Sequence, residues 1–381
     1  MRILYIANAR IPTEKAHGIQ IVKMAGSFAD AGVNLELVLP TRKNQEFKNV
    51  DIHTHYDVQN NFKITKIKTF DPTFLFKFPS GTYIKIQTLL FIKSLRKYFK
   101  QAEIAQDDIL YTRDQYLIPL LLKFSKNVVW EVHDLPRNKA KYARYWKKCS
   151  KVITITQGLS DELEQLGIDH EKIMVAPDGV DLKIFGQVTQ SPADLRDKLS
   201  LPKDKKIVLY TGHLYDWKGA QVLAQAADQI DKSAIVVFLG GIDSDITKFK
   251  SQYGQQENIQ ILDRVEHSQV PEYLQAADVL VLPNSSKTQI SVKYTSPLKL
   301  FEYMTAKKPI VASALPSIRE ILNKENSMLV APDDPEILAR GINKVLVDPA
   351  LAEKISSHAY SEVGQYSWAQ RGKNILDFLT L

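Results

Sequence analysis

The stretch Lys206-Ile-Val-Leu-Tyr-Thr-Gly-His-Leu-Tyr-Asp-Trp-Lys-Gly219 decides the fold class, because in it an apolar strand runs into a loop bounded by two glycines. A helical pattern follows from Ala220 to Ile230, and the next apolar run, Ile235 to Leu239, predicts a second strand. Strand, helix and strand in this order predict two parallel strands joined by a crossover helix. The alternation continues as far as Ala331.

The same alternation occupies the first half of the chain. Met1 to Asn8 predicts a strand, Ile19 to Ala31 a helix and Leu35 to Pro40 a second strand, and the pattern returns from Ile109 to Ala176. Both halves therefore predict an α/β fold, each with a doubly wound, Rossmann-like parallel sheet covered by helices on both faces. Such sheets bind ligands at the carboxyl ends of their strands, so we expect the two domains to face a shared interdomain cleft.

The domain boundary is predicted where this periodicity lapses. Val188-Thr-Gln-Ser-Pro192 is polar, and the alternation restarts at Lys206. We therefore assign residues 1–187 to an N-terminal domain and residues 188–363 to a C-terminal domain. Residues 364–381 are interpreted as a helix that packs back toward the N-terminal domain.

The composition is that of a folded globular chain, with 44% hydrophobic and 24% charged residues among 381. The single cysteine, Cys149, excludes an internal disulfide and any zinc site built from several thiolates. The apolar run at Met1 is too short for a signal peptide or a membrane span. We therefore expect a cytoplasmic location.

The net charge of +7 comes from the first half of the chain. The excess of basic residues is concentrated in residues 60–100 and 137–151. Such clusters indicate a local anionic partner, and solvated lysine-rich helix faces are the alternative.

The loop that ends at Gly219 has the features of a phosphate-binding loop. Gly212 and Gly219 allow a close approach of the backbone to a ligand, the following helix offers free N–H groups, and Lys218 adds a full charge. At an effective dielectric constant near 20, a lysine about 4 Å from a phosphate oxygen gains roughly 4 kcal/mol, more than a helix dipole provides. The alternative is an ordinary strand-to-helix turn with a solvated lysine.

A second cluster follows in Thr295-Ser-Pro-Leu-Lys-Leu-Phe-Glu-Tyr-Met-Thr305. Ser296 as N-cap and Pro297 near the start predict a helix on which Lys299 and Glu302 share one face. Glu302 stands among apolar residues, where a carboxylate needs a partner and can accept both hydroxyls of a ribose. The alternative is a helix-surface ion pair of little worth.

These motifs together resemble those of the family 4 glycosyltransferases of the GT-B fold. The resemblance also includes Ala176-Pro-Asp-Gly-Val-Asp181, Tyr273-Leu-Gln-Ala-Ala-Asp-Val-Leu-Val-Leu-Pro283, Lys308-Pro-Ile-Val-Ala312 and Tyr366-Ser-Trp368. The match runs in order through nearly the whole chain and is strongest in the C-terminal half.

The resemblance implies roles for individual residues. Lys218 resembles the basic residue that holds the donor diphosphate, Glu302 the acid that binds the ribose, and His133 the N-domain histidine that reaches the transferred sugar. These three are the implied catalytic residues. The implied donor-binding set is Gly18, Gly212, His213, Lys218, Ser296, Pro297, Leu298, Lys299 and Glu302.

Two positions depart from the family pattern. Tyr294 stands where the family commonly has an earlier glutamate that binds sugar hydroxyls, and His213 stands where an arginine commonly follows the glycine. The first departure bears on recognition of the donor sugar. The second lowers the charge available to the phosphates, for which Lys299 or Lys293 compensates in our interpretation.

The resemblance implies transfer of a hexosyl or related sugar, with retention, from a nucleotide-diphosphate donor to an acceptor sugar or lipid-linked glycan. Cell-surface polysaccharide or glycolipid assembly is the expected setting. No metal or other cofactor is expected, because Asp243-Ser-Asp245 reads as a solvated turn and His53-Thr-His55 lacks a third ligand nearby.

Other functions stay open on the sequence alone. One is a different GT-B enzyme, such as a nucleotide-sugar epimerase or an inverting transferase. Another is a catalytically silent partner subunit, which Tyr294 and His213 motivate. No nucleic-acid-binding motif accompanies the isoelectric point of 9.1, so we expect no nucleic-acid partner.

A membrane hypothesis rests on Phe74-Leu-Phe-Lys-Phe78 and the following segment from Tyr83 to Lys100, which reads as a basic helix. Interfacial helices combine basic residues with aromatic and leucine side chains. We therefore expect the N-terminal domain to rest on an anionic membrane at its inner face. The alternative is a helix whose apolar face packs on the sheet and whose lysines lie in water.

Overall fold

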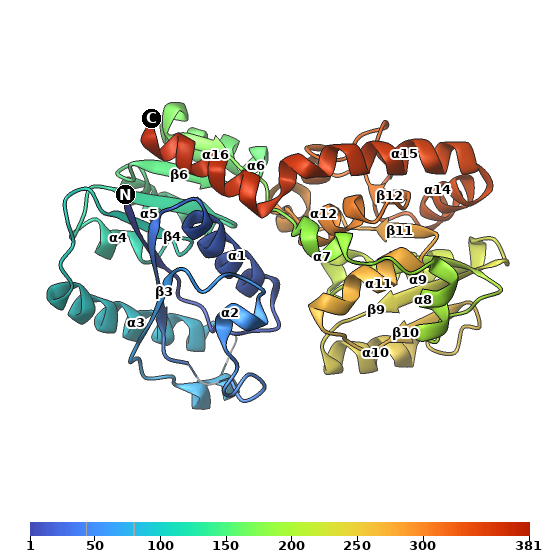
Figure 1. Cartoon of the computed structure of the whole chain (residues 1–381), viewed down its shortest axis with the longest axis horizontal. Coiled ribbons are helices and arrows are strands. Elements are labelled where there is room, and N and C mark those ends of the chain that lie inside the picture. The colour runs from blue at the N-terminus through green and yellow to red at the C-terminus, as the bar shows by residue number, and fades with distance from the viewer. Residues whose placement is uncertain (43, 79–80) are drawn as a thin grey trace. The chain divides into compact units, whose positions relative to one another are not determined.

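A computed structural model of the chain describes residues 1–42, 44–78 and 81–381. These residues form two compact units (Figure 1). Unit 1 comprises Met1–Pro177 together with Trp368–Leu381, and unit 2 comprises Asp178–Ser367. Each unit is a parallel sheet covered by helices, which confirms the predicted α/β class with two Rossmann-like domains.

The sheet of unit 1 has seven strands, all parallel, in the order β3-β2-β1-β4-β5-β6-β7. Strand β1 pairs with both β2 and β4, so the chain reverses its winding direction at β1. The strands are β1 (Arg2–Ile6), β2 (Asn34–Pro40), β3 (Lys63–Ile67), β4 (Ile109–Thr112), β5 (Val128–Val132), β6 (Lys151–Thr154) and β7 (Ile173–Val175).

The helices of unit 1 follow the strands and differ in how much of their surface they bury. In α3 (Thr82–Gln101), for example, Phe91, Leu95 and Phe99 are buried, as the spacing of an amphipathic helix requires, whereas α1 (Ala16–Asp30) is buried on all sides from Gln20 to Ala29. The other helices are α2 (Ile52–His55), η1 (Thr73–Lys77), α4 (Ile118–Leu121), α5 (Lys139–Trp146), α6 (Gln157–Gln165), η2 (His170–Lys172) and α16 (Trp368–Thr380).

The sheet of unit 2 has six parallel strands in the order β10-β9-β8-β11-β12-β13. Successive side chains of a strand point to opposite faces, so Leu209 and Val237 join one apolar cluster and Val208 and Val236 join the other. The strands are β8 (Lys206–Thr211), β9 (Ala234–Leu239), β10 (Ile259–Leu262), β11 (Val279–Leu282), β12 (Ile310–Ser313) and β13 (Met328–Val330).

Helices and short helical turns cover both faces of the second sheet (Figure 1). They are α7 (Leu182–Gly186), α8 (Pro192–Lys198), η3 (Asp216–Lys218), α9 (Ala220–Ala226), η4 (Ala227–Gln229), α10 (Asp243–Tyr253), η5 (His267–Gln269), α11 (Val270–Ala276), η6 (Ile290–Tyr294), α12 (Leu298–Thr305), α13 (Pro316–Arg319), α14 (Pro335–Val347), α15 (Pro349–Glu362) and η7 (Val363–Tyr366).

One strand was not predicted from the sequence, and one loop was assigned wrongly. Strand β3 (Lys63–Ile67) was not expected, because its sequence Lys-Ile-Thr-Lys-Ile is half polar and it lies at the edge of the sheet, where side chains stay partly exposed. Asp243-Ser-Asp245 is not a turn but the first turn of α10, where acidic residues are favourable at the positive end of the helix dipole.

The boundary between the units lies at Pro177 and Asp178, before the position 187/188 chosen from the sequence. The intervening residues belong to unit 2, because Val180 donates from its backbone to Tyr366 O and Phe185 lies in the apolar core of that unit. The chain then returns to unit 1 at Trp368.

Helix α16 packs against α1 inside unit 1, as Figure 1 shows in red and blue. The hydroxyl of Ser27 donates to the carbonyl of Trp368 at 2.8 Å. A Cβ atom at Gly372 would lie 1.9 Å from Oγ of Ser27 and 2.9 Å from its Cβ. The two helices can therefore approach this closely only with glycine at position 372.

We predict that Gly372→Ala destabilises the protein by about 1–3 kcal/mol, because the added methyl overpacks the contact between α1 and α16. Urea unfolding followed by circular dichroism measures the effect. Gly364→Ala is the matched control, since a Cβ atom at Gly364 meets nothing within 4 Å. Equal unfolding midpoints for the two variants would contradict the proposed close contact.

Candidate functional site

The candidate site of unit 2 lies where the sheet changes its winding direction. Strand β8 pairs with both β9 and β11, and ligands of such sheets bind at the carboxyl ends of the strands at this point. The loops that leave β8 and β11 touch, because Ser285 N donates to Trp217 O at 3.0 Å. Gly219 has a φ of +72°, and a Cβ atom there would lie 1.8 Å from Pro283 O. Only glycine fits at this contact.

Lys218 ends the short helix η3 in the loop that leaves β8, and its side chain is partly buried. Its Nζ lies 5.3 Å from the ring centre of Trp217 and 5.8 Å from that of Tyr215. Burial lowers the pKa of Lys218 to about 8, although the charge of Glu302 opposes the shift. Lys218 is therefore not the solvated lysine of an ordinary turn.

Lys299 is buried on the first turn of α12. Its Nζ donates to Thr211 O at 3.2 Å and lies 3.8 Å from the ring centre of Tyr210. Burial and the nearby charge of Lys218 hold the pKa of Lys299 well below its usual range, and Glu302 offsets only part of this effect. The site thus places Lys218 close enough to Lys299 to disfavour the charged form of Lys299.

Glu302 is also buried, so the alternative of a helix-surface ion pair with Lys299 does not hold. Its partner is His267, whose Nε2 lies 2.7 Å from Glu302 Oε1. His267 was not predicted from the sequence, because the two residues are 35 positions apart and His267 belongs to the separate short helix η5. The only signal was the need of a buried carboxylate for a partner.

The neighbouring residues of α12 support the loop after β8. The hydroxyl of Tyr303 accepts a hydrogen bond from Thr211 N at 2.9 Å. Ser296 was predicted to cap this helix, and that prediction was wrong: Pro297 is the N-cap residue and no side chain caps it. Oγ of Ser296 instead accepts from Asp178 N at 2.9 Å, which ties the start of unit 2 to the site.

The two positions that depart from the family pattern are both well packed. The ring of His213 stacks on that of Tyr215, with ring centres 4.9 Å apart and an interplanar angle of 6°. The hydroxyl of Tyr210 donates to His213 O at 2.6 Å. Tyr294 is buried at the end of η6. Neither position carries the charge of the usual family residue.

Asn284 is a further candidate that the sequence analysis missed. It follows β11 directly, and its side chain is buried. Neither its amide oxygen nor its amide nitrogen has a hydrogen-bond partner among the residues that the structure describes. An unpaired buried amide costs about 1–3 kcal/mol, so such a group at the carboxyl end of a strand indicates a ligand contact.

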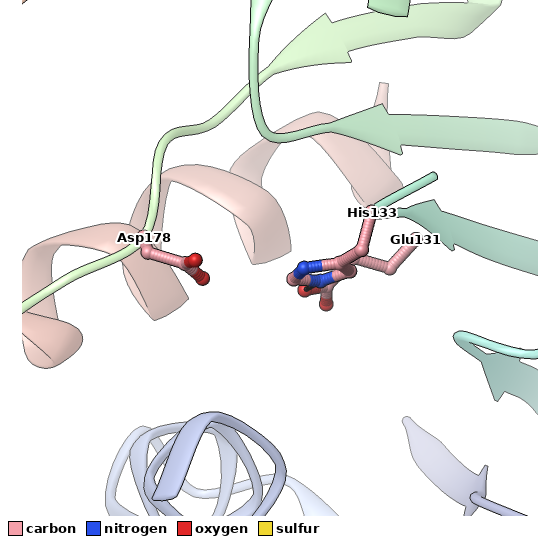
Figure 2. Close-up of side chains that lie close together, drawn as sticks. All are labelled: Glu131, His133 and Asp178. Carbon is pink, nitrogen blue, oxygen red and sulfur yellow. Dashed lines mark hydrogen bonds and ion pairs between the residues drawn. The ribbon is translucent and has the colours of Figure 1, made fainter. Parts of the chain in front are cut away.

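The predicted residues of the first half lie in unit 1. His133 follows β5, and its Nε2 lies 2.6 Å from Glu131 Oε1 (Figure 2). Glu131 is fully buried, and its role was not recognised in the sequence. Gly18 lies in the first turn of α1, where a Cβ atom would meet the Tyr56 hydroxyl at 2.4 Å and Thr13 Cγ2 at 2.7 Å.

Two protein-family models match consecutive parts of the chain. The family model described as "Glycosyltransferase Family 4" matches residues 18–184, and that described as "Glycosyl transferases group 1" matches residues 192–362. The two models follow one another along the chain and together span most of both units.

Curated relatives are distant. A D-inositol 3-phosphate glycosyltransferase of Xylanimonas cellulosilytica is 26% identical over 238 residues, which are 59% of this chain and 55% of the relative. The putative teichuronic acid biosynthesis glycosyltransferase TuaC of Bacillus subtilis is 26% identical over 56% of this chain and 51% of its own length. The chain thus spans about half the length of the curated relatives that it matches.

Solved structures match over the whole chain. Anabaena Alr3699/HepE, solved in complex with UDP, has a TM-score of 0.76 at 16% identity, with 100% of each chain covered. At this identity the similarity establishes the fold alone. Together with the consecutive family matches and the strand orders, it shows that this chain belongs to the family 4 glycosyltransferases of the GT-B fold.

Proposed function

We propose that this chain transfers a hexosyl or related sugar from a nucleotide-diphosphate donor to an acceptor, with retention at the anomeric carbon. The observation that carries the proposal is the placement of Lys218, Lys299 and Glu302 at the point where the sheet of unit 2 changes its winding direction. This set offers two cationic groups and one carboxylate to a single ligand.

The two lysines are suited to a diphosphate. Burial lowers the pKa of both side chains, the charge of Lys218 lowers that of Lys299 further, and Glu302 opposes the shift in each. A bound diphosphate would supply the missing negative charge and restore the charged form of both side chains. Lys299 takes in this proposal the role of the family arginine that His213 replaces.

The carboxylate is suited to the nucleoside part of the donor. Glu302 is held by His267 on one oxygen, and a carboxylate can accept further hydrogen bonds from the two hydroxyls of a ribose. The buried amide of Asn284 offers both a donor and an acceptor to the same ligand. A nucleotide sugar satisfies all these groups.

The proposed reaction needs no nucleophile from the protein. As the glycosidic bond breaks, negative charge develops on the leaving diphosphate, and Lys218 and Lys299 would stabilise it in a buried setting. The donor phosphate then takes the proton of the acceptor hydroxyl on the same face. Tyr294, at the position of the family glutamate, is compatible with this front-face route.

The names of the relatives support the choice of substrates. Two curated relatives are named as glycosyltransferases acting on D-inositol 3-phosphate and in teichuronic acid biosynthesis, and Anabaena Alr3699/HepE was solved with UDP. We propose a nucleotide sugar as donor and an acceptor sugar or lipid-linked glycan of cell-surface polysaccharide or glycolipid assembly. Lys218 and Glu302 favour an active enzyme over a silent partner subunit.

A surface of unit 1 supports a membrane-bound acceptor. Six large apolar side chains on η1, α3 and the segment before them are between 55 and 66% exposed: Phe70, Phe74, Phe76, Phe78, Ile84 and Leu89. The ring of Phe76 packs 4.4 Å from that of Tyr83, so η1 and the start of α3 form one surface. We call these six residues the apolar patch.

Basic residues continue the apolar patch along α3. Lys85, Leu89, Lys93 and Lys97 follow each other at four-residue intervals, so they share one exposed face of the helix. The opposite face packs on the protein through a separate set of buried residues, Gln87, Thr88, Phe91, Leu95 and Phe99. Packing on the sheet therefore leaves the apolar patch unexplained, and we propose that it enters an anionic bilayer surface from the cytoplasmic side. In the part of the chain that the structure describes, no helix is long and apolar enough to cross a bilayer.

We predict that Lys218→Ala and Glu302→Ala each lower the transfer rate roughly 10² to 10³-fold, as the loss of a preorganised electrostatic contact does. The assay follows release of nucleotide diphosphate from a panel of UDP-, GDP- and ADP-sugars. Lys232→Ala and Glu257→Ala remove exposed groups of the same charge from unit 2 and should leave the rate unchanged. Retention of more than half of the wild-type rate by both site variants would show that the donor binds elsewhere.

We predict that chelation does not change the rate, because the proposed site uses lysines rather than a metal ion to stabilise the diphosphate. Transfer is measured before and after treatment with EDTA, followed by dialysis and addition of Mg²⁺ or Mn²⁺. Activity that EDTA abolishes and a divalent cation restores would refute the metal-free mechanism.

We predict that the protein co-sediments with anionic but not with neutral liposomes, and that rising salt weakens the binding. Changing Lys93, Arg96, Lys97 and Lys100 to Gln should weaken it on the order of 10²-fold or more, since each charge near the surface contributes about 1 kcal/mol. The matched control changes Lys141, Arg144, Lys147 and Lys148 of the α5 region to Gln. An equal loss in both variants, or no binding at low salt, would contradict the proposed surface.

A further inference from the structure

A buried polar network in unit 1 connects the last helix of the chain to His133. It comprises Tyr111 on β4, Glu131 on β5, His133 after β5 and Arg371 on α16. We infer that Arg371 is a positioning residue, which fixes the orientation and the tautomer of His133 through Glu131. The inference rests on the proposed function and on the role that the family resemblance implies for His133, contact with the transferred sugar.

Glu131 is the centre of this network. Its Oε1 accepts hydrogen bonds from His133 Nε2 at 2.6 Å and from Arg371 Nη2 at 3.1 Å. Its other oxygen, Oε2, accepts from the hydroxyl of Tyr111. The carboxylate is therefore held on both oxygens, and rotation of its side chain would break three contacts at once.

The charge of Arg371 keeps this carboxylate ionised. Glu131 is 1% exposed and Arg371 3% exposed, so water stabilises neither charge. Burial disfavours the ionised form of Glu131, but the charge of Arg371 and the hydrogen bond from His133 outweigh it and hold the pKa of Glu131 well below its usual range. Without Arg371 the pKa of Glu131 would rise, because the carboxylate would lose the largest of the interactions that offset its burial.

An ionised Glu131 determines the state of the imidazole. A carboxylate accepts hydrogen bonds and donates none, so His133 must carry its proton on Nε2. Any hydrogen bond or proton that His133 exchanges with a substrate must then pass through Nδ1. The side chains of Glu131 and His133 converge at the end of β5 in Figure 2, with a fixed ring orientation as the result.

The position of Arg371 is fixed by hydrogen bonds to the end of the first segment of unit 1, at Ala176 and Pro177. Its Nε donates to Pro177 O at 2.8 Å, and its Nη2 also donates to Ala176 O at 3.1 Å. These carbonyls belong to the last two residues of unit 1 before the chain enters unit 2. The planar, forked guanidinium reaches the carbonyls and Glu131 together, whereas the single ammonium of a lysine cannot present donors in this geometry.

The experiment compares Arg371→Lys, Arg371→Met and Glu131→Gln with the wild type and with Lys373→Met, which removes an exposed charge from the same helix. We expect kcat to fall about 10 to 100-fold in the first three variants, because displacement of a catalytic group from its productive position lowers the rate by such a factor. The donor KM should stay within about twofold, because the groups proposed to bind the nucleotide diphosphate of the donor lie in unit 2. Lys373→Met should behave as the wild type.

A second measurement does not depend on activity. Nitrogen-15 chemical shifts of the His133 ring should show the Nε2–H tautomer in the wild type and a different mixture in Glu131→Gln, which keeps the shape of the side chain and removes its charge. This measurement remains informative if Arg371→Met fails to fold, and also if the wild type transfers no sugar. An unchanged tautomer in Glu131→Gln, or a kcat within twofold of the wild type in folded Arg371 variants, would overturn the inference.

Discussion

The parallel pairing of β8 with both β9 and β11 is the constraint on which the candidate site depends. Because of this pairing, the helices that follow β8 and β11 lie on opposite faces of the sheet. The loops that leave the carboxyl ends of β8 and β11 are therefore in direct contact. The contact of Gly219 with Pro283 then brings Lys218 to the same place as the start of α12. A side chain larger than hydrogen at position 219 would move the loop, and with it the lysine.

Burial of like charges is the energetic feature of this site. Burial lowers the pKa of Lys218 and of Lys299, the charge of Lys218 adds to the shift of Lys299, and the carboxylate of Glu302 opposes both shifts. Folding tolerates this arrangement because the apolar clusters on both faces of the sheet stabilise unit 2 independently of it. Side chains whose charged form is disfavoured in the protein alone and stabilised by a bound anionic ligand are typical of binding sites.

In unit 1, the surroundings of His133 depend on the C-terminal helix α16, which is distant in the sequence. Helix α16 packs on α1, where Ser27 donates a hydrogen bond to the carbonyl of Trp368. The same helix places Arg371 next to Glu131. The residues of this network come from three separate segments, and each is buried by elements that neighbour it only in space. The last residues of the chain thus contribute to the environment of a histidine more than 200 positions earlier.

Hydrophobic periodicity and local motifs were enough to predict the class of fold, most strand and helix positions, and the candidates Lys218, Lys299 and Glu302, because both depend on residues close in the chain. The pairing of these groups follows from the tertiary structure. His267, Asn284, Glu131 and Arg371 acquire their roles from partners far away in sequence, and Ser296 bonds to Asp178 instead of capping its own helix. Burial and hydrogen bonding between distant segments arise only when the sheets assemble, so no local pattern could have revealed them.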